Sequence, residues 1–326
     1  MIVVVGGAGY VGGTVVEYLL EAGEEVCVID NFSTGHPETL ERLPKSIPLY
    51  EGDMADKELI TQVANEQEVD TVMHFAALAL VGESVQRPAR YWEHNFIGTK
   101  KMIDTWMARG VDKFIFSSTA ATYGEPRKIP IPEDHPTQPI NPYGRSKRAV
   151  EWYLEDLYYS HDLKSICLRY FNAAGAGDRV GEDHDPETHL IPLILQVAAG
   201  QRKKIDIYGT DYDTRDGTCL RDFVHVRDLA EGHLRAMKKL DEVGCARINL
   251  GTKTGYTVKE VIEAARQVTD EKIPATPCKR RAGDPARLVA DNKKAKKTLE
   301  WEPKHNLKET ISDAWRWKQA NPEGYT

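Results

Sequence analysis

The chain has 326 residues, with a hydrophobic fraction of 41%, a charged fraction of 29% and a formal net charge of -7 at pH 7. That length favours two lobes with a cleft between them, and the composition is that of an ordinary soluble enzyme, which excludes disordered, collagen-like and membrane classes. The acidic balance argues against nucleic acid as the main ligand.

The five cysteines are odd in number, widely spaced and without a C-x-x-C pair. They therefore suggest neither a disulfide framework nor a zinc knuckle, and a reducing compartment is expected. The first apolar run, Ile2–Val5, is too short for the core of a signal peptide, and no segment has the ~18 apolar residues of a membrane span. We expect a cytoplasmic protein that engages no membrane.

Short β-branched runs alternate with helical patterns through the first half of the chain, which predicts a parallel sheet covered by helices. The expected strands are Ile2–Val5, Glu25–Asp30, Ile47–Glu51, Thr71–Phe75, Lys113–Ser117 and Ser165–Tyr170. The expected long helices are Thr14–Glu21, Tyr91–Arg109 and Tyr143–His161. Beyond residue 172 loops rich in Gly, Asp and Pro take over, and helix and strand signals return at Val224–Met237 and Arg247–Asn249.

A glycine-rich loop joins the first strand to the first helix, with Gly6, Gly9 and Gly12 spaced three residues apart and Tyr10 and Val11 between the last two. In dinucleotide-binding folds the three glycines allow a tight turn, close approach of the pyrophosphate, and close packing of helix on strand. The N-terminus of the helix then presents unpaired N–H groups to the phosphates. A plain glycine-rich loop is the alternative interpretation.

Asp30 ends the second strand, about twenty residues further on, where a carboxylate binds the adenosine ribose and repels a 2′-phosphate. This position favours NAD over NADP. Asn31 beside it is either a cofactor contact or a turn former. After the third strand come Asp53, which either meets the adenine or caps a helix, and Met54.

The small residues after the fourth strand, in the run Phe75-Ala76-Ala77, would let a dinucleotide lie against the backbone. The sequence thus predicts an α/β fold: a Rossmann-type doubly wound parallel sheet with a smaller α/β substrate-binding lobe. We expect residues 1–172 to form the NAD-binding domain, with 223–250 returning to it. Residues 173–222 and 251–326 are expected to form the substrate lobe.

Tyr143 and Lys147 are four residues apart, which places both on one face of a helix. A phenol has a pKa of ~10, and a neighbouring cation favours its ionised form, so Lys147 is a candidate activator of Tyr143 as a base. Such a pair is often only a surface pair, but here it follows a dinucleotide motif and the run Ser117-Ser118-Thr119. The Thr119 hydroxyl is a candidate partner of a reacting oxygen, or part of a strand-end turn.

In their order along the whole chain these motifs resemble the UDP-glucose 4-epimerase family of the extended short-chain dehydrogenase/reductase superfamily. The matching segments are Gly6–Gly12, Asp30-Asn31, His74–Leu78, Val81–Ser84, Phe114–Thr119, Tyr143–Lys147, Arg169–Asn172 and Arg221–Val226. The resemblance implies that Tyr143 is the base and that Lys147 and Thr119 assist it.

With the motifs above, it implies NAD contacts from Gly6, Gly9, Tyr10, Val11, Gly12, Asp30, Asn31, Asp53, Met54, Phe75, Ala76, Ala77, Asn95, Ser117, Tyr143, Lys147 and Tyr170. It implies a UDP-sugar site formed by Thr119, Tyr143, Asn172, His189, Leu190, Tyr208, Arg221, Arg281 and Asp284. Two positions depart from the family pattern: Ala79 stands where several members have lysine, and His189 where others have asparagine.

The implied reaction is NAD-dependent interconversion of UDP-glucose and UDP-galactose. Tyr143 would take the 4-OH proton while hydride passes from C4 to NAD, and the bound 4-keto sugar would then rotate. Alternatives are another nucleotide-sugar 4-epimerase, acting on a UDP-pentose or UDP-uronate, a net dehydrogenase, and a non-catalytic NAD-sensing regulator. A dehydratase needs a carboxylate after the hydroxyl residue, where this chain has Ala120-Ala121.

Three further expectations concern substrate range, metal and assembly. Leu288 falls where a large tyrosine goes with rejection of N-acetyl sugars in the family, so UDP-N-acetylglucosamine is expected as a further substrate. The run Asp183-His184-Asp185 with His189 suggests an exposed substrate loop more than a metal site, and no metal is expected. The resemblance implies a homodimer through the two helices that carry Trp92, Trp106, Trp152, Tyr153 and Tyr158.

Overall fold

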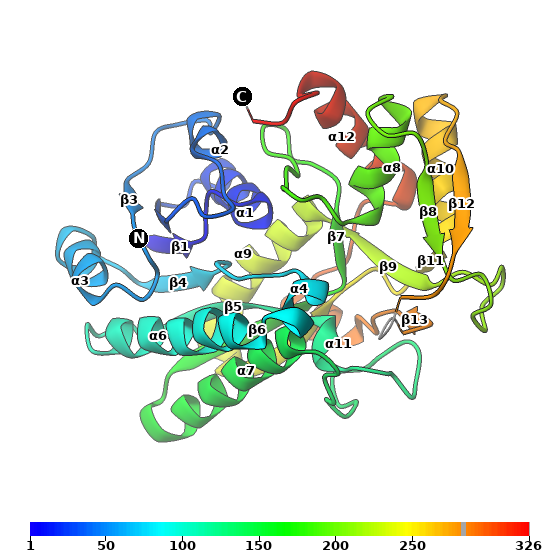
Figure 1. Cartoon of the computed structure of the whole chain (residues 1–326). Helices are drawn as coiled ribbons and strands as arrows, with labels where there is room; N and C mark the ends of the chain where they lie inside the picture. Colours follow the sequence, from blue (N-terminus) through cyan, green and yellow to red (C-terminus); the bar gives the residue numbers. More distant parts are fainter. Residues whose placement is uncertain (282–284, 326) are drawn as a thin grey trace.

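The computed structural model describes residues 1–281 and 285–325 and is built around a seven-stranded sheet in the order β10-β6-β5-β4-β1-β2-β3 (Figure 1). All neighbouring strands in it are parallel. The strands are β1 (Ile2–Val5), β2 (Val26–Asp30), β3 (Leu49–Glu51), β4 (Thr71–His74), β5 (Lys113–Thr119), β6 (Lys164–Tyr170) and β10 (Cys245–Leu250). The chain direction across the sheet reverses between β1 and β4, and such switch points are where open α/β sheets bind ligands.

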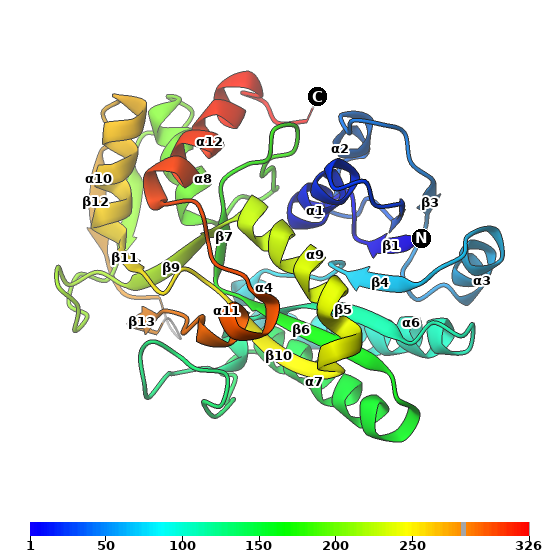
Figure 2. The ribbon, with the colours of Figure 1, turned by 180° about the vertical axis from the view of Figure 1, so that it is seen from behind.

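Helices cover both faces of this sheet because its strands are apolar on both sides. One face packs against α1 (Tyr10–Glu21), α9 (Val226–Val243) and α11 (Lys293–Leu299), which lie in front in Figure 2. The other face packs against α3 (Lys57–Glu66), α6 (Thr99–Met107) and α7 (Pro142–His161). Alternate residues of one strand serve the two cores: Ile2 and Val4 belong to the first, Val3 and Val5 to the second.

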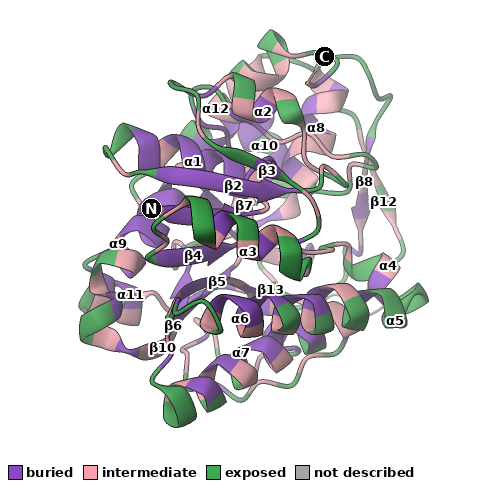
Figure 3. Cartoon of the chain, turned by 90° about the vertical axis from the view of Figure 1, so that its left-hand side faces the viewer, coloured by how far each residue is buried: buried purple, intermediate pink, exposed green. Residues whose placement is uncertain are grey.

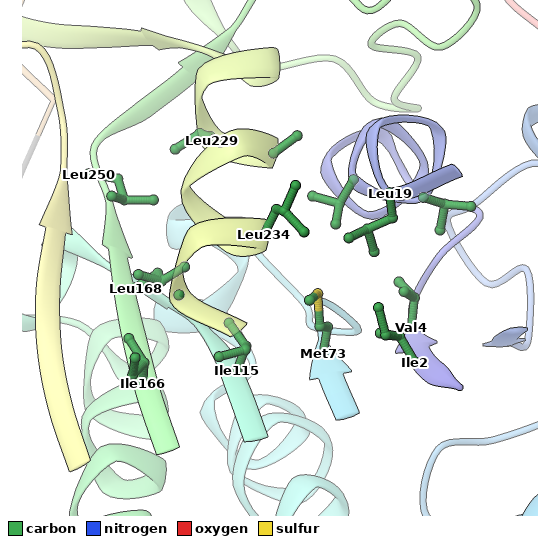
Figure 4. Close-up of a cluster of buried hydrophobic side chains, with 14 of the residues drawn as sticks. Ile2, Val4, Leu19, Met73, Ile115, Ile166, Leu168, Leu229, Leu234 and Leu250 are labelled. Carbon is green, nitrogen blue, oxygen red and sulfur yellow. The ribbon is translucent and has the colours of Figure 1, made fainter. Parts of the chain in front are cut away.

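Figure 4 shows the first core, where side chains from the strands meet Leu19 of α1 and Leu229 and Leu234 of α9. The central strands are buried along most of their length in Figure 3, while the outer faces of the helices are exposed. Short segments complete this half: α2 (Pro37–Glu41), α4 (Val81–Gln86), α5 (Pro88–Tyr91), a π-helix (Trp92–Gly98) and a 3₁₀ turn (Ala120–Thr122).

The second half of the chain adds two smaller sheets. β9 (Leu220–His225) pairs with β7 (Asn172–Ala174), β11 (Gly255–Thr257) and β13 (Arg287–Leu288), and β8 (Ile205–Tyr208) pairs with β12 (Ala275–Cys278). The helices α8 (Leu190–Ala198), α10 (Val258–Thr269) and α12 (Leu307–Ala320) share a third apolar core with these strands. Within the described residues, no helix combines the length and the apolar character that crossing a bilayer requires.

The predicted α/β class with its Rossmann-type sheet is confirmed, and all six expected strands form. Three helix predictions were wrong in detail. The first helix begins at Tyr10 rather than Thr14, because its glycines pack against the preceding loop and hid the helical pattern. The segment Tyr91–Arg109 is interrupted by the π-helix and α6 ends at Met107. Val224 and His225 lie in β9, so the return to the large sheet starts with α9.

Candidate active site

The glycine loop closes tightly over the end of β1. Gly6 has φ 83°, and a Cβ there would lie 2.5 Å from the Ala76 nitrogen, while a Cβ on Gly12 would lie 2.1 Å from the Gly6 carbonyl oxygen. Gly9 differs, since its Cβ would meet nothing closer than 3.6 Å, and it is the N-cap of α1. Gly6 and Gly12 are thus required by packing within the chain, whereas Gly9 leaves the helix N-terminus open to a ligand.

A cavity lies in front of this N-terminus, at the carboxyl ends of the strands. It is lined by Val5, Gly6, Gly9, Ile29, Asp30, Asn31, Ser33, Thr34, Gly35, Gly52, Met54, Phe75, Ala76, Ala77, Leu78 and His94. Asp30 is buried, and its two oxygens accept hydrogen bonds from the backbone N–H of Ala8 at 2.8 Å and of Phe32 at 2.9 Å. Asp30 therefore braces the glycine loop from the end of β2.

Two predicted cofactor residues form turns. Asn31 accepts a hydrogen bond from the Ser33 N–H at 3.1 Å, and Asp53 accepts one from the Ala55 N–H at 2.8 Å. Both are exposed, and only Asn31 lines the cavity. The helix-capping role considered for Asp53 belongs instead to Asp56, which accepts from two N–H groups at the start of α3.

Asn95 is buried in the π-helix and holds the loop after β4. Its side chain accepts from the Leu78 N–H at 2.9 Å and donates to the Leu78 carbonyl at 2.9 Å, with the Ser146 hydroxyl at 3.4 Å. This is a positioning role, because Leu78 itself lines the cavity. A π-helix often marks a functional site, and this one also places His94 at the cavity wall. Sequence periodicity gave no sign of either feature.

The predicted catalytic residues come together at the carboxyl end of β5 and the start of α7. The side chain of Tyr143 lies beside that of Thr119, the last residue of β5. Lys147 is buried one turn later, and its Nζ donates to the Ser117 carbonyl at 2.9 Å and lies 4.8 Å from the centre of the Phe116 ring. The spacing of Tyr143 and Lys147 thus brings them to one face of α7, as the sequence predicted.

Local packing fixes how α7 approaches β5. Asn141 caps the helix by accepting from the Gly144 N–H at 2.8 Å. A Cβ on Gly144 would lie 2.5 Å from the Ala121 carbonyl oxygen, so the first turn of α7 presses directly on the loop after Thr119. That close approach is what allows the two hydroxyls to meet.

The electrostatics differ from the expectation that Lys147 lowers the pKa of Tyr143. Burial raises the pKa of the Tyr143 phenol, and the hydrogen bond with Thr119 opposes that shift. Burial also lowers the pKa of Lys147, to about 7, so this side chain is only partly charged at neutral pH in the chain alone. Burial therefore keeps the phenol protonated in the chain alone.

Tyr170, a predicted cofactor residue, is engaged by the protein. Its hydroxyl is hydrogen-bonded to Nε2 of His233, whose Nδ1 bonds the Leu229 carbonyl at 2.8 Å. The His233 ring packs against Phe75 with a centroid separation of 4.8 Å. Tyr170 and His233 therefore support the cavity wall at Phe75, and no sequence motif singles out His233.

The predicted substrate residues lie on the two smaller sheets and at the start of α8. Arg281 stacks its guanidinium over the Tyr208 ring at 4.0 Å, and Arg221 in β9 pairs in register with Leu288 in β13. Asn172 begins β7 and Leu190 begins α8. His189 makes ion pairs with Glu182 and Glu187, each at 2.9 Å, and Ala79 is exposed. Asp284 lies outside the described residues.

The parallel sheet, the glycine loop, and Tyr143 and Lys147 on one face of α7 define a dinucleotide-binding protein of the tyrosine-lysine class. Residues 2–251 match the family model described as the NAD dependent epimerase/dehydratase family. The UDP-glucose 4-epimerase of Halalkalibacterium halodurans is 49% identical over 100% of this chain and 97% of its own. The chain belongs to the UDP-glucose 4-epimerase family.

Solved structures agree with this assignment. A crystal structure of a UDP-glucose 4-epimerase superposes with a TM-score of 0.96 at 46% identity, covering 100% of this chain and 99% of that one. The UDP-glucose 4-epimerase of Bifidobacterium longum, in complex with NAD+ and UDP, gives a TM-score of 0.95 at 38% identity, with 99% of each chain covered. The similarity therefore extends over both the large sheet and the smaller ones.

Proposed function

We propose that the chain is an NAD-dependent UDP-glucose 4-epimerase that interconverts UDP-glucose and UDP-galactose through a 4-keto intermediate. The observation that carries this proposal is the placement of Tyr143 beside Thr119 at the carboxyl end of β5, with the buried Lys147 one turn later on α7. The likeness to a solved epimerase in complex with NAD+ and UDP supports both ligands. The open helix N-terminus at Gly9 and the braced carboxylate of Asp30 suit a dinucleotide.

Bound NAD would accept and return a hydride at C4 of the sugar. In its phenolate form Tyr143 would receive the proton of the sugar 4-OH, and as the phenol it would give the proton back after the sugar has turned. Thr119 would orient the phenol that lies beside it, and the Ser117 carbonyl, which accepts from the Lys147 Nζ, would direct the ammonium group toward the site. Because burial opposes ionisation of Tyr143, its proton transfer depends on these two neighbours.

We further propose that the smaller sheets, with α8, α10 and α12, form the lobe that holds the UDP. Arg221 is the candidate for the diphosphate, since a guanidinium binds phosphate oxygens through two N–H groups. The stacked pair of Arg281 and Tyr208 suits the far end of the nucleotide. Asn172, the first residue of β7, and Leu190, the first residue of α8, are further candidates for contacts with the UDP.

The direct test is to assay the purified protein for C4 inversion with UDP-glucose and UDP-galactose in both directions. Exchange at equilibrium without added NAD is the expected result. A UDP-pentose or UDP-uronate turned over while both hexoses are ignored would favour the alternative epimerases. Bound NAD without turnover of any UDP-sugar would favour the non-catalytic regulator. We propose a cytoplasmic enzyme, in keeping with its five free cysteines.

Replacing Asp30 with asparagine should weaken NAD binding about tenfold and narrow the preference for NAD over NADP. The charge that opposes a 2′-phosphate is removed, and an amide oxygen cannot match both acceptor oxygens that now hold the Ala8 and Phe32 N–H groups. Calorimetric titration with NAD and NADP measures both effects. Asp56→Asn, at the cap of α3, is the matched control and should change neither affinity.

We propose that UDP-N-acetylglucosamine is accepted beside UDP-glucose because Leu288 leaves room near the sugar. Leu288 pairs with Arg221 and packs against a small cluster that contains Ala120, directly after Thr119. Leu288→Tyr should therefore lower kcat/KM for the N-acetyl substrate by at least ~10-fold, with UDP-glucose turnover as the internal control. If wild type and Leu288→Ala both ignore the N-acetyl substrate, this position is not the gate.

We propose a homodimer through the surface of α4, the π-helix and α7. Trp106 is buried in the core and does not contribute to this surface. The exposed apolar side chains on it are Val81, Val85, Trp92, Trp152 and Tyr159. Such clustered apolar side chains are typical of an interface. Light scattering should give twice the 36.7 kDa chain mass, and Trp152→Glu should shift the protein toward monomer. A monomeric wild type at micromolar concentration would contradict the proposal.

A further inference from the structure

A cluster of two histidines and two glutamates closes the loop between β7 and α8. His189 Nδ1 lies 2.9 Å from Glu182 Oε1 and 2.9 Å from Glu187 Oε1. His184 Nδ1 lies 3.3 Å from Glu182 Oε1 and 3.6 Å from Glu187 Oε2. One atom from each residue converges, so that all four lie within 4.8 Å of one another.

The spacing of these atoms is that of ligands in tetrahedral coordination around a small metal ion. Nitrogen and oxygen atoms bonded to zinc at about 2.0–2.1 Å lie about 3.3 Å apart along the edges of the tetrahedron. The distances to Glu182 Oε1 from the two histidine nitrogens, 2.9 and 3.3 Å, and from His189 Nδ1 to Glu187 Oε1, 2.9 Å, are close to that value, and His184 Nδ1 lies 3.6 Å from the other Glu187 oxygen.

Hydrogen bonding alone accounts poorly for the arrangement. His184 Nδ1 is buried and, within the described part of the chain, no partner meets it with hydrogen-bond geometry, although two carboxylates are near. His189 Nδ1 is hydrogen-bonded to Glu187 Oε1 at 2.9 Å but lies equally close to Glu182 Oε1, and it can donate only one N–H. His184 Nδ1, which lies between two carboxylates and bonds neither, is placed as a co-ligand of a shared centre.

We propose that Glu182, His184, Glu187 and His189 form a closed structural site for Zn²⁺. Two imidazoles and two carboxylates are a donor set that zinc accepts, and two carboxylates balance its charge. Four protein ligands leave no open position, so the site would have no catalytic role of its own.

This proposal revises the expectation that no metal is bound. The sequence paired the histidines with Asp183 and Asp185, but those carboxylates are directed elsewhere. Asp183 accepts from the Tyr325 N–H at 2.9 Å, and Asp185 is exposed. The carboxylates that meet the histidines are those of Glu182 and Glu187 on the same loop.

The site would fasten the loop to both halves of the molecule. The His184 ring meets the edge of Tyr10 with centroids 6.2 Å apart, and the Tyr10 hydroxyl donates to the Gly175 carbonyl at 2.7 Å. At its other end the loop runs directly from His189 into α8. A zinc ion at this point would hold the start of α8 against the first turn of α1.

The test is the zinc content of the full-length protein, purified without a histidine tag from zinc-supplemented medium and measured by plasma mass spectrometry after desalting. About one zinc per chain is expected in wild type and in Asp185→Asn, the matched control on the same loop. His184→Ala/His189→Ala should lose it. Glu187→Gln should weaken Zn²⁺ binding by more than about 100-fold, since even outer-shell changes cost 10–100-fold.

A second measurement covers the case in which a variant does not fold. Wild-type protein is stripped with a chelator and titrated with Co²⁺, which should give the intense visible absorption of a tetrahedral site, and added Zn²⁺ should abolish it. Wild type without zinc, and without that spectrum on Co²⁺ addition, would overturn the proposal. Equal zinc in wild type and the double histidine variant would also overturn it. Neither readout depends on epimerase activity.

Discussion

Replacing Tyr143 with phenylalanine is expected to lower kcat by about 10³-fold, the scale on which a positioned acid or base contributes. The substitution removes one oxygen, which lies beside Thr119 and is the group that would exchange a proton with the sugar. The half-buried ring remains, so the fold and the bound NAD should be unchanged. Steady-state assays with UDP-galactose, together with the absorbance of bound nucleotide, measure both parts.

Tyr159→Phe is the matched control, since Tyr159 lies on the same helix and is exposed. It loses the same atom and should keep full turnover. Near-wild-type activity in Tyr143→Phe would remove Tyr143 from the mechanism. A lost activity accompanied by a lower melting temperature would instead indicate that the hydroxyl pair stabilises the start of α7.

The large sheet was predictable because its strands are short, apolar on both faces and separated by helices, so that local pattern alone reveals them. The glycine loop was predictable for a related reason. Gly6 and Gly12 are imposed by contacts within a few residues or with the adjacent strand, which leave a fixed spacing in the sequence. Tyr143 and Lys147 needed only the period of a helix.

What escaped prediction depends on contacts between distant segments. The helix expected from Val224 wrongly includes the last two residues of β9, because the pairing of this strand with β7 and β13 joins residues far apart in the chain. The hydrogen bonds between Asn95 and Leu78 depend on a π-helix, and its period differs from the α-helical period that sequence patterns detect. The ion pairs of His189 with Glu182 and Glu187 arise from a loop without periodicity.

The sign of an electrostatic effect was also beyond the sequence. A lysine one turn from a tyrosine suggests a cation that lowers the pKa of the phenol. Burial changes that outcome, because it lowers the pKa of Lys147 to about 7 and raises the pKa of Tyr143. The degree of burial follows from how α7 packs on β5, and sequence spacing does not report it.

Replacing Lys147 with methionine should lower turnover by at least about 100-fold but should not destabilise the protein. Methionine fills a similar space but carries no charge. It avoids the cost of burying Lys147, which is greatest at pH values where the amine is protonated. In nucleotide-free protein at pH 6–7 the variant should therefore unfold at the same or higher urea concentration than wild type. Loss of stability at pH 7 would show that the bond to the Ser117 carbonyl outweighs the desolvation.

The stability difference should also depend on pH in one direction. Between pH 7 and about 10.5 the unfolded chain keeps a proton on Lys147 that the folded chain has largely released, so raising the pH favours folding of wild type. The free energy of unfolding of wild type should therefore rise, relative to that of Lys147→Met, by up to about 1.4 kcal/mol per pH unit over that window. Lys297→Met, an exposed lysine on α11, should show no such gain. Urea unfolding at pH 6, 7, 8 and 9 measures the trend, and a difference that stays constant would mean that the Lys147 amine is solvated and charged throughout.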